Sequence, residues 1–293
     1  MSAPFRTVPP RRSRAVVLQF PEPKVKQILV PREHGSWGMW SLPLVSGAVI
    51  GAASPHAGAG EALVWIIVAA TSAFLAYQPL EALLGTSPVK ARTEEERQFA
   101  LAWALLMVMI SLFASGMLLM MGRTQILWFA AVGALCFGVR FLFGNSRRLR
   151  ISKQLLGALG LTSASAAAYY AVSGRLNTTS IFIWGATWLF AVAQIEYVQL
   201  RMRTPNAKSV EKVEVGWKVF VLHLMVFIIG VAAAIAGKAP ALLPIAFIPA
   251  MVRLGLWTAQ KPAKIDFHAL GFSELFQSSL FTALVVLAFV ARF

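Results

Sequence analysis

Long apolar runs separated by short charged segments fill this chain from residue 37 to its end. A helix of about 20 apolar residues crosses roughly 30 Å of hydrocarbon, and nine runs are close to that length. The runs cover residues 37–53, 62–84, 99–121, 125–143, 154–173, 180–200, 216–236, 240–258 and 270–291. The pattern predicts an all-α fold class, a polytopic membrane protein with about nine transmembrane helices.

The charged segments between the runs are strongly asymmetric. If the N-terminus lies in the cytoplasm, 23 of the 27 Lys and Arg residues fall on the cytoplasmic side. The four on the other side are Arg123, Arg175, Lys238 and Arg292. Cytoplasmic loops of membrane proteins carry an excess of Lys and Arg. We therefore predict an N-in, C-out orientation.

Composition supports a membrane protein and argues against other classes. The chain is 58% hydrophobic and 13% charged, with a mean hydropathy of +0.68, whereas soluble domains carry about 25% charged residues. The net charge of +15 lies in short segments between apolar runs, which suits lipid headgroups rather than nucleic acid. The single cysteine, Cys136, excludes an internal disulfide, and we expect it to be buried.

Two regions of different character follow from the composition. Residues 1–30 contain five prolines and six basic residues, and they predict a disordered cytoplasmic tail that rests on anionic lipid. A tail with no role fits the same residues. Residues 31–293 predict a single transmembrane helical domain.

The stretch P-R-E-H-G-S-W-G-M-W at residues 31–40 places three polar residues against the first apolar run. These are Arg32, Glu33 and His34. Two tryptophans follow, and their amphipathic rings favour a membrane–water boundary. We interpret the stretch as a polar gate at the cytoplasmic surface.

Further polar residues gather at the predicted cytoplasmic ends of the runs, whereas the outer halves are nearly free of charge. Ionisable residues inside membrane spans cost free energy, so their presence there suggests a functional site. A cavity open to the cytoplasm would collect them, so we expect a ligand-binding set made of Arg32, Glu33, His34, Gln78, Glu81, Lys153, Glu196, Tyr197, Arg201, His223 and Glu274. Arg253, late in the eighth run, lies at the same side. Alternatively, these charged residues only set the orientation of the protein in the membrane, with their side chains extended to the lipid headgroups.

Small residues in the runs predict close helix packing. Gly47 and Gly51 form a G-x-x-x-G pair, and small residues cluster from Ser163 to Ala168. Such residues let the backbones of membrane helices approach each other.

The stretch at residues 31–39 resembles the opening signature of the YwiC-like family of bacterial integral membrane proteins. R-R-L-R-I-S-K-Q-L-L-G-A-L-G from residue 147, and K-I-D-F-H-A-L-G-F-S-E at residues 264–274, extend the resemblance over about residues 28–290. It implies a multi-pass protein of the bacterial inner membrane, without an established biochemical activity.

A more distant resemblance is to the UbiA-type prenyltransferases, which have nine helices, an N-in, C-out orientation and a cytoplasm-facing active site. Those enzymes bind Mg²⁺-pyrophosphate through two Asp-rich motifs. The matching positions here read Y-Q-P-L-E-A-L-L-G at residues 77–85 and A-Q-I-E-Y-V-Q-L-R at residues 193–201, and Asp266 is the only aspartate in the chain. Bridging pyrophosphate through hard cations needs several carboxylates. We therefore expect no metal and no cofactor, and whether the chain is an enzyme stays open.

Three functions fit these observations. The first is a UbiA-like bundle whose cytoplasm-facing cavity binds a lipid or an isoprenoid-like ligand. The second is a transporter of small solutes, although transporters usually place polar groups near the midplane and often show internal repeats. The third is a non-catalytic membrane scaffold.

Overall fold

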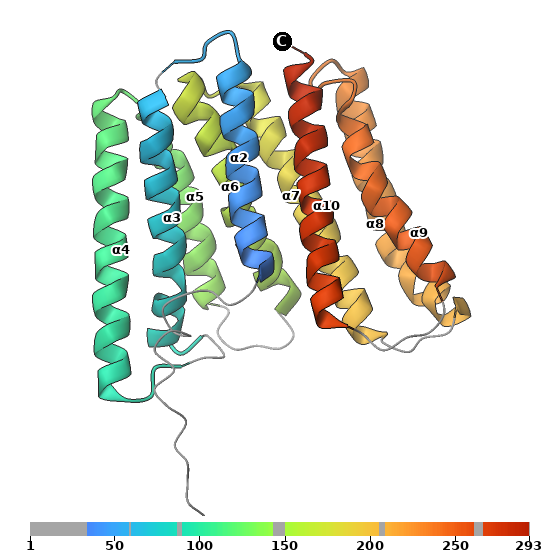
Figure 1. Cartoon of the computed structure of the whole chain (residues 1–293), viewed down its shortest axis with the longest axis horizontal. Coiled ribbons are helices and arrows are strands. Elements are labelled where there is room, and N and C mark those ends of the chain that lie inside the picture. Colours follow the sequence, from blue (N-terminus) through green and yellow to red (C-terminus); the bar gives the residue numbers. More distant parts are fainter. Residues whose placement is uncertain are drawn as a thin grey trace, which may run out of the picture.

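The computed structural model describes residues 34–58, 60–86, 90–142, 150–204, 209–260 and 266–292, and these residues form helices joined by turns and short loops. The helices are α2 (His34–Ala53), α3 (Gly60–Leu83), α4 (Glu94–Met120), α5 (Ile126–Leu142), α6 (Arg150–Ser173), α7 (Thr178–Arg203), α8 (Ser209–Ile235), the 3₁₀ helix η1 (Leu243–Phe247), α9 (Ile248–Ala259) and α10 (Phe267–Val290). Successive helices run in alternating directions along the bundle, with η1 and α9 acting as one segment (Figure 1). The all-α polytopic class is confirmed.

Each predicted apolar run coincides with a helix in the described part of the chain. Six helices, α3, α4, α6, α7, α8 and α10, are long and apolar enough to cross a membrane by length and composition. The run at residues 240–258 differs from a regular helix. It is divided into η1 and α9, with Pro244 and Pro249 near the division, because proline cannot donate the backbone hydrogen bond that a continuous helix needs.

Local sequence sets the helix ends. Thr93 forms a reciprocal capping box with Glu96 at the start of α4, and Asn177 forms one with Ser180 at the start of α7. Glycines with φ between 67° and 77° follow α3, α4, α6 and α8, and they are Gly85, Gly122, Gly174 and Gly237. Residues with side chains rarely adopt this left-handed backbone. The chain can therefore reverse direction within a few residues.

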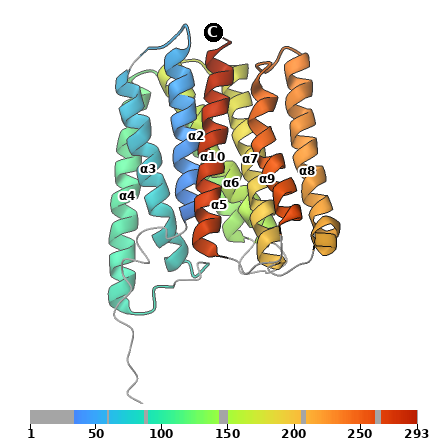
Figure 2. The ribbon, with the colours of Figure 1, turned by 45° about the vertical axis from the view of Figure 1, so that its right-hand side comes forward.

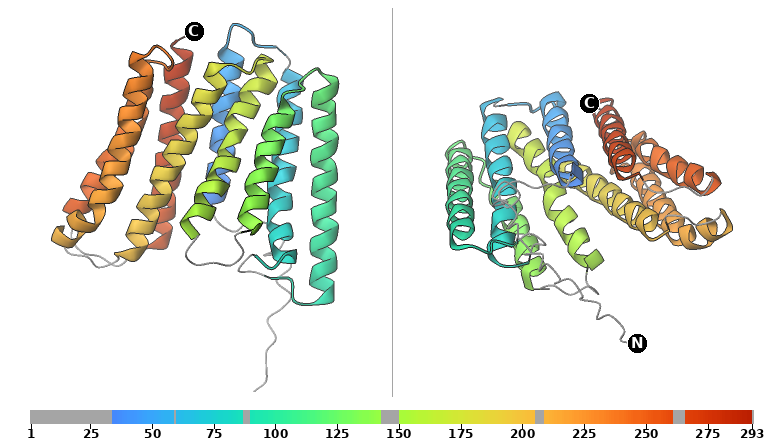
Figure 3. Two further views of the ribbon diagram at one scale, coloured as in Figure 1. Left: turned by 180° about the vertical axis from the view of Figure 1, so that it is seen from behind. Right: turned by 60° about the horizontal axis from the view of Figure 1, so that its bottom comes forward.

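The bundle has two groups of helices with α2 between them. Helices α3 to α6 pack together on one side, and α7 to α10 pack together on the other. Helix α2 contacts both α6 and α10, so it links the groups near the middle (Figures 1 and 2). A second link runs from α6 to α7. The view toward the lower end in Figure 3 shows α8 and α9 at the edge of the second group.

Helices α2 and α6 approach each other closely at the predicted glycine pair. A Cβ added at Gly47 would lie 1.8 Å from the carbonyl oxygen of Ser165 on α6. One added at Gly51 would lie 3.1 Å from the carbonyl oxygen of Tyr169. At Gly47 only glycine permits this separation, and at Gly51 a side chain would be crowded, so the small residues of α2 and α6 pack as predicted.

The outer faces of the bundle are apolar. Large side chains of α4 and α8, including Leu112, Phe113, Ile228 and Ile229, are more than half exposed. Soluble monomers rarely expose apolar surface on this scale. Together with the helix lengths, this identifies an integral membrane protein whose α4 and α8 face lipid.

Candidate functional site

Arg253 on α9 is the centre of a buried polar group in the second half of the bundle. Its Nη1 atom lies 2.6 Å from Oε1 of Glu274 on α10 and 3.4 Å from Oγ of Ser273. Its Nη2 atom donates to the side-chain oxygen of Gln194 on α7. The guanidinium also lies over the ring of Tyr197, 3.9 Å from its centroid. One cation therefore holds three helices together through charge, hydrogen bonds and a cation–π contact.

A second set of contacts lies nearer the lower end of Figure 1, where α7 and α9 end and α8 begins. Arg201 donates from Nη1 to the hydroxyl of Tyr197 at 3.2 Å, and its guanidinium lies 6.0 Å from the ring centroid of Trp257. Lys212 on α8 donates to the carbonyl oxygens of Gln260 at 2.7 Å and of Trp257 at 3.3 Å. These are carbonyls at the C-terminus of α9, where a cation is favourable.

His223 on α8 lies within electrostatic range of Arg253 and is 3% exposed. Its Nδ1 atom is 2.8 Å from the carbonyl oxygen of Val219. A carbonyl oxygen only accepts, so Nδ1 carries the proton in this contact. The other ring nitrogen, Nε2, is buried and has no hydrogen-bond partner among the described residues.

Three more buried polar atoms on neighbouring helices also lack a partner in the described part of the chain. They are Nε2 of Gln194, Nε of Arg253 and Oε1 of Gln277, which lies one turn beyond Glu274 on α10. Buried polar atoms in folded proteins are nearly always paired, so a group of unpaired ones calls for an explanation. We refer to Gln194, Tyr197, Arg201, His223, Arg253, Glu274 and Gln277 as the Arg253 cluster.

Aromatic rings limit the cluster on its upper side. Phe190 and Phe281 stack with ring centroids 3.9 Å apart, and Phe247 lies 5.3 Å from Phe281. Phe190 lies one turn from Gln194 on α7, and Phe281 one turn from Gln277 on α10. From the stack to the upper ends of α7, α8, η1, α9 and α10, the described residues of these helices carry no charged side chain. The polar groups therefore extend from the lower end of the bundle only part of the way through it.

The predicted candidate residues are divided between this cluster and other places. Tyr197, Arg201, His223 and Glu274 lie in the cluster. Arg253, Gln194 and Gln277 also belong to it, although the sequence-based set left them out. Gln194 and Gln277 could have been found in the sequence as amide side chains within an apolar run, each one turn from a charged or aromatic residue.

Two candidates belong to α3, in the first half of the bundle. Glu81 is buried and accepts a 2.8 Å hydrogen bond from the hydroxyl of Tyr77, whose ring packs edge-on against Phe137 of α5. Gln78 lies on the same helix and is half-buried. Helix α3 packs mainly against α4 and α6.

The remaining candidates are Lys153, Glu196 and the three polar residues of the stretch at residues 31–40. Lys153 is half-buried near the start of α6, where the neighbouring Gln154 accepts a 3.0 Å hydrogen bond from Gln199 of α7. Glu196 is half-buried on α7 and, at 100° per residue, is displaced from the face shared by Gln194, Tyr197 and Arg201. Arg32 and Glu33 lie outside the described residues, as does the side chain of His34 at the start of α2. A single cavity shared by all of these residues stays a prediction.

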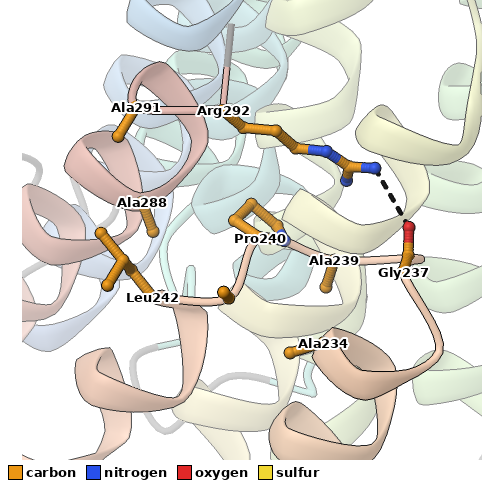
Figure 4. A pocket seen from close by; sticks show the side chains of 9 residues that line it. Ala234, Gly237, Ala239, Pro240, Leu242, Ala288, Ala291 and Arg292 are labelled. Carbon is orange, nitrogen blue, oxygen red and sulfur yellow. Dashed lines mark hydrogen bonds between the residues drawn. The ribbon is translucent and has the colours of Figure 1, made fainter.

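A hollow of about 350 Å³ lies at the opposite, upper end of the bundle (Figure 4). Its lining includes Ala234, Ala239 and Ala288, with Arg292 above it. Arg292 donates to the carbonyl oxygens of Gly237 at 3.1 Å and Lys238 at 3.3 Å. The hollow is lined mainly by small apolar residues and lies away from the Arg253 cluster, so we do not assign it the polar ligand.

The carboxylates in the described residues do not form a metal centre. No group of three or more His, Cys, Asp or Glu side chains lies close enough there to hold an ion. Asp266 caps α10, accepting from the backbone N–H groups of His268 at 2.9 Å and Ala269 at 3.1 Å. It thereby fulfils a structural role as an N-cap.

Comparison with protein families identifies the first half of the bundle. Residues 30–172 match the YwiC-like protein family. The match covers just under half of the 293 residues and confirms the resemblance seen in the motif at residues 31–39. This YwiC-like region contains helices α2 to α5 and nearly all of α6. The Arg253 cluster and the motif at residues 264–274 lie beyond it.

Neither a curated protein nor a solved structure matches the chain. The resemblance of the helix bundle to the UbiA-type fold therefore stays a prediction. The YwiC-like region supports a multi-pass membrane protein but assigns no reaction to α7–α10. Any function of the Arg253 cluster must be argued from its own chemistry.

Proposed function

We propose that this integral membrane protein binds a lipid or isoprenoid-like ligand from the cytoplasmic side, with the polar head of the ligand at the Arg253 cluster. The cation asymmetry of the sequence supports the orientation, because the end that holds the cluster is the end rich in Lys and Arg. In a bacterial cell, this end would lie on the cytoplasmic side of the inner membrane.

One observation carries this proposal: a buried ion pair is surrounded by polar atoms that lack partners. Arg253 and Glu274 are 11% and 17% exposed, and unpaired atoms of Gln194, His223 and Gln277 lie on the helices around them. A buried ion pair is weak evidence for stability, since apolar residues of similar volume often stabilise as well. Ionisable residues inside membrane spans are rare, and where they occur they commonly belong to a binding site or to an ion pathway.

The exposed cations of the same end support a second contact with lipid. Arg92, Arg97, Arg203 and Lys218 are all exposed. Each such cation near an anionic membrane surface contributes about 1 kcal/mol of attraction. We propose that these residues rest on anionic headgroups and are separate from the ligand site.

Lipid extraction from purified protein tests the proposal. The variant combines Arg253→Met with Glu274→Gln, which removes both charges and leaves no unpaired buried ion. Arg203→Met serves as the matched control, because Arg203 is an exposed arginine at the end of α7. We expect mass spectrometry to find a lipid in the wild type and the control that is depleted in the double variant. Equal lipid content in all three proteins would contradict the proposal.

A transporter is the second candidate, and the division between η1 and α9 favours it. Discontinuous helices often form substrate sites in transporters. The stack of Phe190 on Phe281 weighs against a continuous polar path in this conformation. If a purified, lipid-free wild type binds a water-soluble solute in a manner that depends on Arg253, the transporter takes first place.

A further inference from the structure

We infer that the head bound at the Arg253 cluster is uncharged and hydroxylated, as in an isoprenoid alcohol, and is not a phosphate or diphosphate ester. This inference rests on the proposed function and specifies its ligand. Two properties of the cluster carry it, the balance of charge and the arrangement of donors and acceptors.

The charge of the cluster falls short of that of a diphosphate, because Arg201 and Arg253 are set against Glu274. Glu274 neutralises Arg253 at 2.6 Å, Gln194 accepts from its Nη2 atom, and the ring of Tyr197 covers its face. Arg201 lies nearer the lower end of the bundle, bonded to Tyr197 and placed against Trp257. A diphosphate needs several free cations or bridging Mg²⁺, and no three His, Cys, Asp or Glu side chains lie together in the described residues to hold such ions. A deeply placed diphosphate would therefore be left with uncompensated charge.

The unpaired atoms offer both donors and acceptors. Arg253 Nε and the amide nitrogen of Gln194 can only donate. His223 has its proton on Nδ1, facing the carbonyl of Val219, so its buried Nε2 presents a lone pair and needs a donor. A proton on both ring nitrogens would place a second positive charge near Arg253, with Glu274 left to balance both.

A hydroxyl group fits this arrangement, because it accepts and donates at once. An ionised phosphate offers only acceptor oxygens, so it could bond Nε2 of His223 only if both ring nitrogens carried a proton. The stack of Phe190 on Phe281 places apolar rings one turn beyond both amides, so a compact polar head is favoured over a long one. We therefore assign His223 to accept from the ligand hydroxyl, and Gln194 and Arg253 to donate to it.

Three probes with one tail and different heads test the assignment. They are geranylgeraniol, its methyl ether and geranylgeranyl diphosphate, each titrated into purified full-length protein and followed by the fluorescence of its tryptophans. We expect the alcohol to bind about tenfold or more tightly than the ether, which cannot donate, and than the diphosphate. Each tenfold change corresponds to about 1.4 kcal/mol.

His223→Leu should abolish the preference of the alcohol over the ether, whereas His268→Leu, at an exposed position near the start of α10, should keep it. ¹⁵N NMR of the wild type gives a reading that does not depend on variant folding. The chain has four histidines, and we expect His223 in the Nδ1–H form with an Nε2 resonance that shifts when the alcohol is added. An Nε2–H form would overturn the inference.

The outcomes separate this inference from the proposed function. Tighter binding of the diphosphate, lost in the Arg253→Met, Glu274→Gln variant, would overturn the uncharged head and leave the ligand site intact. Equal binding of the alcohol and the ether would overturn the role of His223. No binding of any probe, together with no copurified lipid, would overturn both proposals.

Discussion

Arg253 on α9 and Glu274 on α10 form an ion pair of 2.6 Å in which both side chains are largely buried. The pair joins two helices that are adjacent in sequence, and the contacts of Arg253 with Gln194 and Tyr197 extend it to α7. Arg253 is therefore one of the side chains that fix the position of α9, together with Lys212, which binds the carbonyls at the end of that helix.

We expect Arg253→Ala to lower the free energy of unfolding by about 3–5 kcal/mol, because it leaves the carboxylate of Glu274 buried without its partner. Combining Arg253→Met with Glu274→Leu should recover much of that loss. Thermal unfolding in detergent measures the effect. Arg203→Ala, at an exposed site, should change stability by less than about 0.5 kcal/mol. The losses of Arg253→Met and Glu274→Leu are also measured separately. If the loss in the double variant equals the sum of these two losses, the two residues are not coupled.

Gly47→Ala should destabilise the bundle by about 1–3 kcal/mol, because the new Cβ would meet the carbonyl oxygen of Ser165 and force α2 away from α6. Gly116→Ala is the control. Nothing lies within 4 Å of a Cβ added there, in the interior of α4, and alanine favours a helix over glycine by about 1 kcal/mol. The two variants should shift the unfolding temperature in opposite directions, and a shift in the same direction would count against the packing.

Asp266→Ala should cost about 0.5–2 kcal/mol through loss of the N-cap of α10, whereas Asp266→Asn should cost little because asparagine caps equally well. Thermal unfolding with and without Mg²⁺ distinguishes a cap from a metal ligand. If Mg²⁺ stabilised the wild type and Asp266→Asn removed that effect, the aspartate would be a metal ligand and the pyrophosphate mechanism would return.

Reporter fusions after Ser54, Gly122, Gly174, Ala239 and Phe293 should all report the outer side, because the Lys and Arg residues concentrate on the other. Fusions after Thr86 and Arg203 serve as controls and should report the cytoplasm. A cytoplasmic signal at Phe293 would make the number of crossings even and overturn the orientation.

The fold was largely predictable because each membrane helix corresponds to a long apolar run of the sequence. Such a segment forms a helix because its backbone N–H and C=O groups must make their hydrogen bonds within the segment. The glycine pair of α2 was predictable for a similar reason, since little besides close packing favours Gly47 within a helix. The division of the eighth run into η1 and α9 was not, because Pro244 and Pro249 can equally bend a continuous helix.

The site was predictable only in part. The position of a residue along its helix follows from the boundaries of the apolar run. The sequence therefore places Tyr197, Arg201, His223 and Glu274 at one end of the bundle. Their partners depend on which helix faces are adjacent, and this is a tertiary property that no single span encodes. Glu81 therefore joins Tyr77 of its own helix, while Gln194 meets Arg253, 59 residues later in the chain.

The stacked rings of Phe190 and Phe281 have a consequence for bioenergetics. A row of charged and amide groups through the whole bilayer would leak protons or ions and discharge the membrane, where 100 mV corresponds to about 2.3 kcal/mol per elementary charge. Here the row ends at two aromatic rings 3.9 Å apart, and beyond them the described residues of α7, α8, η1, α9 and α10 carry no charged side chain. A proton or an ion that reached the Arg253 cluster would therefore meet apolar side chains beyond the stack, and we expect the protein to leave the membrane potential intact despite its ion pair.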